Sequence, residues 1–297
     1  MDLNYLKSFY MTVKCNSISR AAKKLHLTQP GLSIQIQNLE NEVGATLLER
    51  SNKGVELTEE GQIVFEHANT MLSLEKNIIK NLEDLQNEKK KLSICACKSL
   101  GEYVIPCSIY TFREIYVDVN VFLEVYNTNT VIKKLLSHDT NIAIITGEHD
   151  FENIETVPIL EDEFLLIAGP DVEEESITLD EITDIPLILR EKGSYNKVLL
   201  SKTLLEHSIN IDDLNIVLSV NSSESIKSSV SSGRGYAFLP KIVVKRELRR
   251  GTLKEIKIQD FEAKFSYYLA YRKNYKFTKC EEYFKKFITS NKRCFCY

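Results

Sequence analysis

The spacing of apolar residues changes once along the chain, and this change limits the folds available to it. Up to about residue 90 apolar side chains recur at helical intervals, whereas from Lys91 onward short apolar runs alternate with helical segments. The first pattern predicts a helical region, and the second predicts an α/β domain with parallel strands. With 297 residues, of which 43% are hydrophobic and 27% charged, the chain is long enough for two or three globular domains.

The residues before Gly44 predict three helices. A first amphipathic helix follows Asp2 as its N-cap, and a second follows Ser17. Thr28 is the expected N-cap of the third helix, because Pro30 then falls in the first turn, where its missing N–H is tolerated. A tight turn separates the second and third helices. This order predicts a helix-turn-helix that offers its second helix to a DNA major groove.

The outward face of the third helix supplies candidate DNA contacts. Its core stripe is expected to contain Leu32, Ile36, Leu39 and Val43. A rotation of about 100° per residue turns the opposite face outward, with Ser33 on the flank and the helix start exposed. The candidate contacts are Gln29, Pro30, Ser33, Ile34, Gln37 and Asn38.

A two-stranded wing with a basic tip is predicted around the polar segment 51–54. Arg50 and Lys53 are placed there for phosphate or minor-groove contacts, which fix register on a duplex rather than read its sequence. Residues 1–58 hold seven basic and five acidic side chains, a net charge of +2 in a chain of net charge −4. This basic excess is too weak to establish DNA binding on its own.

A long helix is predicted after Thr58, which is a suitable N-cap. Val64, Met71, Ile78 and Leu85 step by seven residues along it. Such a repeat is typical of two paired helices, and the alternative is a helix packed on its own domain. The charged run 88–91 predicts a solvated hinge.

The residues between Ser19 and Gly61 resemble the LysR family of bacterial transcriptional regulators. The resemblance includes the run from Ser19 to Ser33, with Gln29-Pro30, and the later Leu57-Thr58 followed by Gly61. It continues through Gly101-Glu102-Tyr103, Ser222-Ser223-Glu224 and Gly233-Arg234-Gly235. The resemblance implies a winged helix-turn-helix DNA-binding domain (1–58), a dimerising linker helix with a hinge (59–90) and an effector-binding domain (91–297).

The same resemblance implies that the effector domain is periplasmic-binding-protein-like. Subdomain I would hold residues 91–162 and 267–297, and subdomain II residues 163–266. A ligand is expected in the cleft between them, outside the carboxyl ends of strands, where free backbone N–H groups favour an anion. The candidate effector contacts are Lys98, Ser99, Thr128, Thr146 and Ser194. Helix capping is the alternative role for each hydroxyl. The positive charge of Lys98 favours an anionic effector.

Several residues depart from the family pattern, among them Leu48, where Phe is usual, and Lys98, where a small polar residue is more common. Ile34 stands where the family usually has Arg, so we expect weaker dependence on G·C pairs and a preference for A·T-rich half-sites. Asn141 stands where Asp is common. Arg234 replaces a small apolar residue and is expected to be exposed.

The leading hypothesis is a cytoplasmic, ligand-gated transcription regulator that is not an enzyme and uses no cofactor or metal. Its expected partners are double-stranded DNA with paired half-sites, a small-molecule effector, RNA polymerase and a second copy of itself, as homodimer or homotetramer, with no membrane. A solute-binding protein or cleft enzyme is an alternative, but none of the five histidines lies in a recognisable catalytic or metal motif. A thiol-redox-gated regulator is a second alternative. The seven cysteines are otherwise expected to be reduced.

Overall fold

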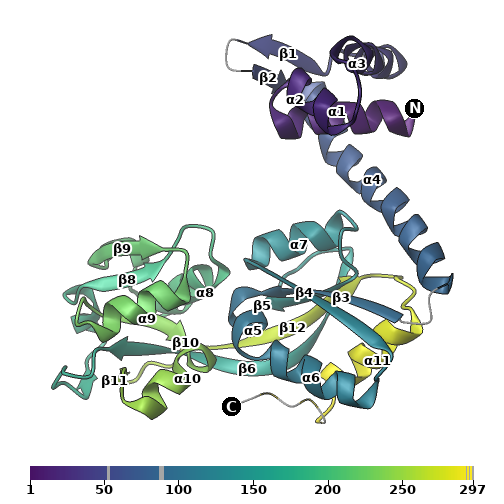
Figure 1. The fold of residues 1–297 in the computed structure, drawn as a ribbon. Coiled ribbons are helices and arrows are strands. Elements are labelled where there is room, and N and C mark those ends of the chain that lie inside the picture. The colour runs from purple at the N-terminus through teal and green to yellow at the C-terminus, as the bar shows by residue number, and fades with distance from the viewer. Residues whose placement is uncertain (52–53, 87–89, 292, 294, 296–297) are drawn as a thin grey trace. The chain divides into compact units, whose positions relative to one another are not determined.

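The computed structural model describes residues 1–51, 54–86, 90–291, 293 and 295, without the side chains of 50, 51, 80, 81 and 83–86. The chain forms two compact units. Unit 1 holds residues 1–86 and 136–139, and unit 2 holds the rest. The ribbon of each unit is drawn in Figure 1.

Unit 1 consists of helices and one hairpin. Its first three helices form the predicted helix-turn-helix, and the hairpin is antiparallel, with Leu48 paired with Leu57 and Ser51 with Gly54. The elements are α1 (Leu3–Cys15), α2 (Ile18–Lys24), α3 (Gln29–Val43), β1 (Leu48–Ser51), β2 (Gly54–Leu57) and α4 (Glu59–Gln86).

Short side chains fix the ends of these helices. The side chains of Asp2, Ser17 and Thr28 accept hydrogen bonds from backbone N–H groups in the first turns of α1, α2 and α3. The α1–α2 and α2–α3 turns each contain a residue with positive φ, Asn16 at 47° and His26 at 55°. Asn is among the residues that tolerate this conformation best.

Two small apolar clusters hold unit 1 together. Leu32, Ile36 and Leu39 of α3 are buried, as the stripe predicts. Val43 is 40% exposed, so its assignment to the stripe was wrong. It is the last residue of α3, where the helix leaves the cluster.

Helix α4 divides into a packed first half and an apolar exposed second half. Ala68 is fully buried, and Val64 packs with it in the unit 1 core. Further along, Ile78 and Leu82 are more than half exposed. The first half of α4 therefore packs on its own domain, as the alternative interpretation expects. The second half presents the apolar face that pairing with another helix would cover. Leu85 has no described side chain.

Unit 2 is an α/β fold in which subdomain I and subdomain II share strand β6. Subdomain I carries β3 (Lys90–Cys97), α5 (Lys98–Tyr103), α6 (Ile105–Ile115), β4 (Val119–Tyr126), α7 (Thr128–Leu136), β5 (Ile142–Thr146), β12 (Lys264–Arg272) and α11 (Lys279–Ile288). Subdomain II carries β7 (Ser176–Ile177), η1 (Asp180–Thr183), β8 (Leu187–Arg190), α8 (Tyr195–Glu206), η2 (Ile211–Asp213), β9 (Ile216–Val220), α9 (Ser223–Ser231), β10 (Ala237–Pro240), α10 (Lys241–Arg250) and β11 (Lys254–Ile258). Strand β6 (Ile154–Ala168) runs through both (Figure 1).

The sheets are mixed rather than parallel throughout. Strand β3 pairs in parallel with β4 and β5, and β8 with β9. Strand β12, however, is antiparallel to β5 and to β6, and β6 is antiparallel to β10 and β11. The expectation of parallel strands was wrong for this central part, because β6 and β12 are the two strands that cross between the subdomains.

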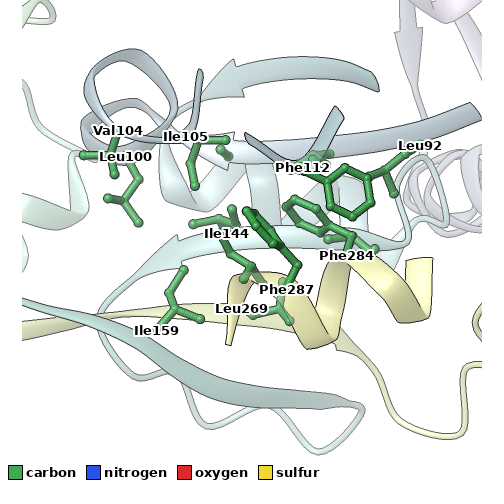
Figure 2. Close-up of a cluster of buried hydrophobic side chains, with 14 of the residues drawn as sticks. Leu92, Leu100, Val104, Ile105, Phe112, Ile144, Ile159, Leu269, Phe284 and Phe287 are labelled. Atoms are coloured by element: carbon green, nitrogen blue, oxygen red, sulfur yellow. The ribbon is translucent and has the colours of Figure 1, made fainter. Parts of the chain in front are cut away.

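The main core of subdomain I lies between its sheet and helices α6 and α11. Phe112 of α6 meets Phe284 edge-on, with ring centroids 5.4 Å apart, and also contacts Phe287 (Figure 2). Two further clusters fill subdomain II on either side of β6 and β10. Each subdomain therefore has a hydrophobic core of its own. These cores hold in place the strands and helices that carry the side chains of the cleft.

The prediction of a hinge at 88–91 was wrong for its last two residues. Lys90 and Lys91 begin strand β3, where they pair with Val119 and Asn120, so the charged run continues into the sheet. Residues 88 and 89 lie outside the description.

The cysteines only partly follow the expectation of reduced thiols. Cys15, Cys95, Cys97 and Cys280 are buried thiols that are not in a disulfide. Cys107 is disulfide-bonded, so the expectation was wrong for it. Cys294 and Cys296 lie outside the description. Among the helices of the described residues, none is long and apolar enough to cross a membrane.

Candidate DNA-binding face and effector cleft

The outward side of α3 carries the predicted DNA contacts. Ile34 is 59% exposed, and Gln29, Pro30 and Gln37 are also exposed. Ser33 and Asn38 are half-buried at the edges of the face. The helix is anchored from behind, where Ser8 of α1 donates a 2.5 Å hydrogen bond to Gln35. A surface of this kind can enter a major groove, because its polar side chains are free to meet base edges.

The wing is fastened to the helices by two polar side chains. Glu40 of α3 accepts hydrogen bonds from the backbone N–H groups of Leu47, at 2.7 Å, and Leu48, at 3.3 Å. Asn16 accepts one from the N–H of Val55 at 2.9 Å. The side chain of Arg50 and all of Lys53 lie outside the description, so their contacts remain predictions.

The Leu57-Thr58 and Gly61 pattern has a physical reason in this structure. The Thr58 hydroxyl donates to the carbonyl of Thr46 at 2.8 Å and accepts from the N–H of Gly61 at 2.8 Å. A Cβ at Gly61 would lie 2.0 Å from the carbonyl oxygen of Leu47. The first turn of α4 can therefore sit against the start of the wing only with glycine at this position.

All five predicted effector residues line a single pocket in unit 2. Lys98 and Ser99 start α5, Thr146 ends β5, and Thr128 and Ser194 lie at the starts of α7 and α8. Four of the five are buried, and Lys98 is half-buried. These positions are the carboxyl ends of β3, β4, β5 and β8, so strand ends of both subdomains converge there.

The hydroxyl groups in this pocket are not helix caps. Ser194 occupies the N-cap position of α8, but its side chain makes no capping hydrogen bond. At α7 the cap is Asn127, which accepts from the N–H of Thr130 at 2.8 Å, while Thr128 is the first helical residue. Ser99 accepts instead from the side-chain amide of Asn196 at 3.1 Å. The capping alternative is therefore wrong for Thr128, Ser194 and Ser99.

The pocket also contains residues that the sequence did not single out. Arg190, at the end of β8, is 4% exposed, and its guanidinium makes hydrogen bonds of 2.8 and 3.1 Å with Glu191. A charged residue directly after the apolar run Leu187–Leu189 was the available signal. The further lining residues are Cys97, Asn127, Tyr195 and Asn196.

Direct contacts between the subdomains fill the pocket and leave about 10 Å³ of free volume. Lys98 donates to the carbonyl of Asn221 at 2.7 Å, and Tyr195 donates to that of Glu148 at 3.0 Å. Asn129 donates to the carbonyl of Gly193 at 3.4 Å. Such a volume is about that of one water molecule, whereas small-molecule sites measure about 300–1,000 Å³. The cleft is therefore closed in this structure.

Buried ionisable groups surround the closed cleft. Burial raises the pKa of the Cys97 thiol, while a hydrogen bond with Thr146 acts in the opposite direction. Burial also raises the pKa of Tyr267, whose hydroxyl donates to Asp162 at 3.5 Å. The unreactive protonated form of the Cys97 thiol is thus favoured.

Two departures from the family pattern in this unit have structural explanations. The side chain of Asn141 accepts from Arg272 at 2.6 Å and donates to Glu281 at 3.2 Å, so an amide suits a position between a cation and a carboxylate. Arg234 is exposed, as expected. Neither residue belongs to the pocket.

Known families match almost the whole chain. Residues 3–62 match the bacterial regulatory helix-turn-helix proteins of the lysR family, and residues 85–291 match the LysR substrate binding domain. A probable RuBisCO transcriptional regulator of Gracilaria tenuistipitata var. liui is 32% identical, over 97% of this chain and 96% of that protein.

Solved structures agree in fold. CbnR, a LysR family transcriptional regulator, gives a TM-score of 0.72 at 20% identity over 97% of this chain and 98% of CbnR. The regulatory domain of CcmR from Synechocystis PCC6803, solved with 2-PG, gives a TM-score of 0.61 at 21% identity over 67% of this chain and 95% of that domain. With its helix-turn-helix, wing and two-subdomain cleft, the chain belongs to the LysR family of DNA-binding transcriptional regulators.

Proposed function

We propose that this regulator reads paired half-sites in double-stranded DNA through the outward face of α3 and is gated by a small anionic effector in the cleft of unit 2. The domains would be 1–58, 59–90 and 91–297, as the sequence predicts. The observation that carries the effector proposal is the convergence of Lys98, Ser99, Thr128, Thr146 and Ser194 on one pocket.

An anion is the chemistry that this pocket suits best. The first residues of α7 and α8 line it, and helix N-termini present free N–H groups and positive dipole ends. Lys98 adds a cation, and the guanidinium of Arg190, which is paired with Glu191, adds hydrogen-bond donors. The solved complex of CcmR with 2-PG and that of QuiR with shikimate are examples of small molecules held by related domains.

Gating follows from the closed form of the cleft. An effector must take the place of the contacts that Lys98 and Asn196 make across it, so binding selects an opened arrangement of the subdomains. An effector that binds one arrangement more tightly shifts the population of the two. The shift would reach the DNA through the placement of the paired DNA-binding domains.

The exposed apolar half of α4 supports a second copy of the chain as partner. Ile78, Ile79 and Leu82 are each more than half exposed, and a heptad-like apolar face is normally covered by another helix. A homodimer built on α4, or a homotetramer, would match paired half-sites. RNA polymerase at the promoter, a cytoplasmic location and the absence of enzymatic activity complete the proposal.

The effector proposal is tested by thermal shift of the full chain against a panel of small carboxylates and phosphate esters. A binding anion is expected to raise the unfolding temperature of the wild type but not of Thr128→Val or Lys98→Met. Lys202→Met, at an exposed lysine on α8, is the matched control and should keep the response. A response that survives in both cleft variants would contradict the proposed pocket.

The DNA proposal is tested by fluorescence anisotropy of the full chain on a duplex found by site selection. Gln37→Ala should weaken binding to the selected duplex by roughly tenfold without changing binding to random DNA. The control is Glu66→Ala, at an exposed position on α4 away from the face. Equal losses on selected and random duplexes would remove α3 as the reading element.

Gating by thiol oxidation is a second hypothesis, favoured by the disulfide-bonded state of Cys107. Against it, burial raises the pKa of Cys280 to about 11, as it raises that of Cys97, and protonated thiols react slowly. An oxidant response of DNA binding that disappears in Cys107→Ser would support this hypothesis, and an unchanged response would remove it.

A further inference from the structure

A second groove lies where α5 of subdomain I meets α9 and α10 of subdomain II. It measures about 510 Å³, which is within the range of small-molecule sites, and it shares no residue with the cleft. One wall is formed by Glu102 and Tyr103 of α5 and by the following Val104, and the other by residues of α9 and α10. An occupant would therefore touch both subdomains.

The floor of the groove is an ionic network around the buried ammonium of Lys227, and it joins the two walls. The ammonium of Lys227, only 7% exposed, lies 2.7 Å from the carboxylate of Glu224 and 2.9 Å from that of Glu247. It also lies 4.9 Å from the ring centre of Tyr103. Tyr103 in turn donates to Glu224 at 2.6 Å. Glu224 is thus already engaged by groups of the protein, whereas Glu247 binds Lys227 through one oxygen and its other oxygen, Oε2, is buried without a hydrogen-bond partner among the described residues.

The α10 wall carries three arginines close together on the helix. Arg246, Arg249 and Arg250 stand at positions i, i+3 and i+4, so they share one face of the helix. None of them forms an ion pair with a carboxylate of the described residues. The positive charge of Arg246 helps to lower the pKa of the Glu224 carboxyl by electrostatic attraction.

Folding alone does not explain three neighbouring guanidinium groups. Cations in the last turn of a helix are favoured by its dipole, which accounts for Arg249 and Arg250 near the C-cap Gly251. Like charges at these spacings, however, repel one another. With Lys227 and Lys245, five cations line the groove against the carboxylates of Glu102, Glu224 and Glu247. The groove is therefore net positive in a chain of net charge −4.

We propose that this groove is a second ligand site, separate from the cleft, for a small dianion held by Arg246, Arg249 and Arg250. Guanidinium groups bind carboxylate and phosphate oxygens in pairs, so a dicarboxylate or a phosphate ester has the required chemistry. Because the groove spans the junction of the subdomains, its occupant changes the relative stability of their arrangements.

The test uses pyrophosphate as the probe and isothermal titration of the full chain in a buffer free of divalent cations. The groove variant carries Arg246→Gln, Arg249→Gln and Arg250→Gln, all at exposed positions, so folding is expected to persist and is checked by circular dichroism. The matched control removes three exposed cations elsewhere on unit 2, through Lys202→Gln, Arg234→Gln and Lys257→Gln.

Wild type and control are expected to bind pyrophosphate alike, and the groove variant roughly tenfold or more weakly. Anion binding by the DNA-binding domain is present in all three proteins and cancels in the comparison. The proposal is overturned if wild type binds no pyrophosphate at millimolar concentration, or if groove variant and control lose affinity equally. It is also overturned if affinity is lost in the cleft variant Ser99→Ala with Thr128→Val but kept in the groove variant.

Discussion

Replacing Asp162 with Asn tests how a buried carboxyl on the crossover strand β6 affects the stability of unit 2. The side chain is 8% exposed, and burial raises its pKa from 3.8 to about 7. Hydrogen bonds from the backbone N–H groups of Glu163 and Ile242 and from Tyr267 act in the opposite direction but are outweighed. The neighbouring charges are Glu161, Glu163, Lys241 and Lys264, of which Lys241 and Glu163 form an ion pair at 2.5 Å.

The sign and size of the effect follow from the two pKa values. As pH rises, the unfolded chain loses this proton near pH 4 and the folded chain only near pH 7, so the free energy of unfolding falls across that window. The full difference corresponds to about 4 kcal/mol, and the part between pH 5 and pH 8 to about 2–3 kcal/mol. Asn keeps the shape and an acceptor oxygen but does not ionise, so Asp162→Asn should lose this dependence.

The measurement is thermal unfolding of the full chain at pH 5 and pH 8, followed by far-ultraviolet circular dichroism because the chain has no tryptophan. Relative to wild type, Asp162→Asn should gain roughly 5–10 °C between pH 5 and pH 8 in the transition of unit 2. Glu161→Gln, at the exposed neighbouring position, should follow the wild type. Parallel behaviour of wild type and Asp162→Asn would refute the assignment of a high pKa to this carboxyl.

Three further predictions concern unit 1. Gly61→Ala should destabilise it by about 1–3 kcal/mol in urea unfolding, because the new Cβ meets the carbonyl of Leu47 at 2.0 Å; an unchanged midpoint would show that the wing moves freely. Asn16→Gly keeps the left-handed backbone but removes the 2.9 Å hydrogen bond to Val55, so the free energy of unfolding should fall by about 0.5–1.5 kcal/mol. An unchanged free energy of unfolding would mean that this hydrogen bond contributes nothing. Ile34→Arg should add a preference for guanine of about 1–3 kcal/mol at one position of each half-site, and an invariant guanine already present opposite Ile34 in the wild-type selection would contradict the argument.

The helices of unit 1 could be predicted closely because their determinants are local. N-caps at Asp2, Ser17 and Thr28 and the glycine after α3 mark the ends of elements by short-range hydrogen bonds and backbone preferences. The exposure of Val43 could not be predicted in this way. Burial at this position depends on which neighbour reaches the end of α3 and not on the place of Val43 in the stripe. Periodicity says which face is apolar, but not how far the core extends along it.

Strand β6 shows where sequence patterns fail in unit 2. Its last five residues, Phe164–Ala168, form an apolar run of the kind that predicts a buried strand, whereas Ile154–Glu163 mixes apolar side chains with Glu155, Pro158 and three consecutive acids. Pairing with β12 along its whole length makes that segment a strand, and this contact is more than 100 residues away in sequence.

Lys98, Ser99, Thr128 and Thr146 could be predicted as a set because parallel strands deliver their carboxyl ends to one edge of a sheet, whereas the inclusion of Ser194 from the other subdomain was implied by the family resemblance. Arg190 could not be distinguished from a surface arginine, since its burial arises from the fold of subdomain II around it. The sequence also did not show whether the cleft is open or closed. Whether Lys98 faces an effector or the carbonyl of Asn221 depends on the relative position of the two subdomains, which no local pattern encodes.

The contacts that close the cleft limit the kind of effector that can act on it. Four hydrogen bonds cross it, from Lys98, Asn129, Tyr195 and Asn196, and at about 0.5–1.5 kcal/mol each they favour the closed form by about 2–6 kcal/mol. A ligand must exceed this through its differential affinity for the open form, and reversing a 1:99 population requires about 5.5 kcal/mol. Neutral hydroxyl contacts merely replace the bonds that are broken. An anion gains in addition from the N-termini of α7 and α8 and from the ammonium of Lys98, so charge supplies the difference on which gating depends.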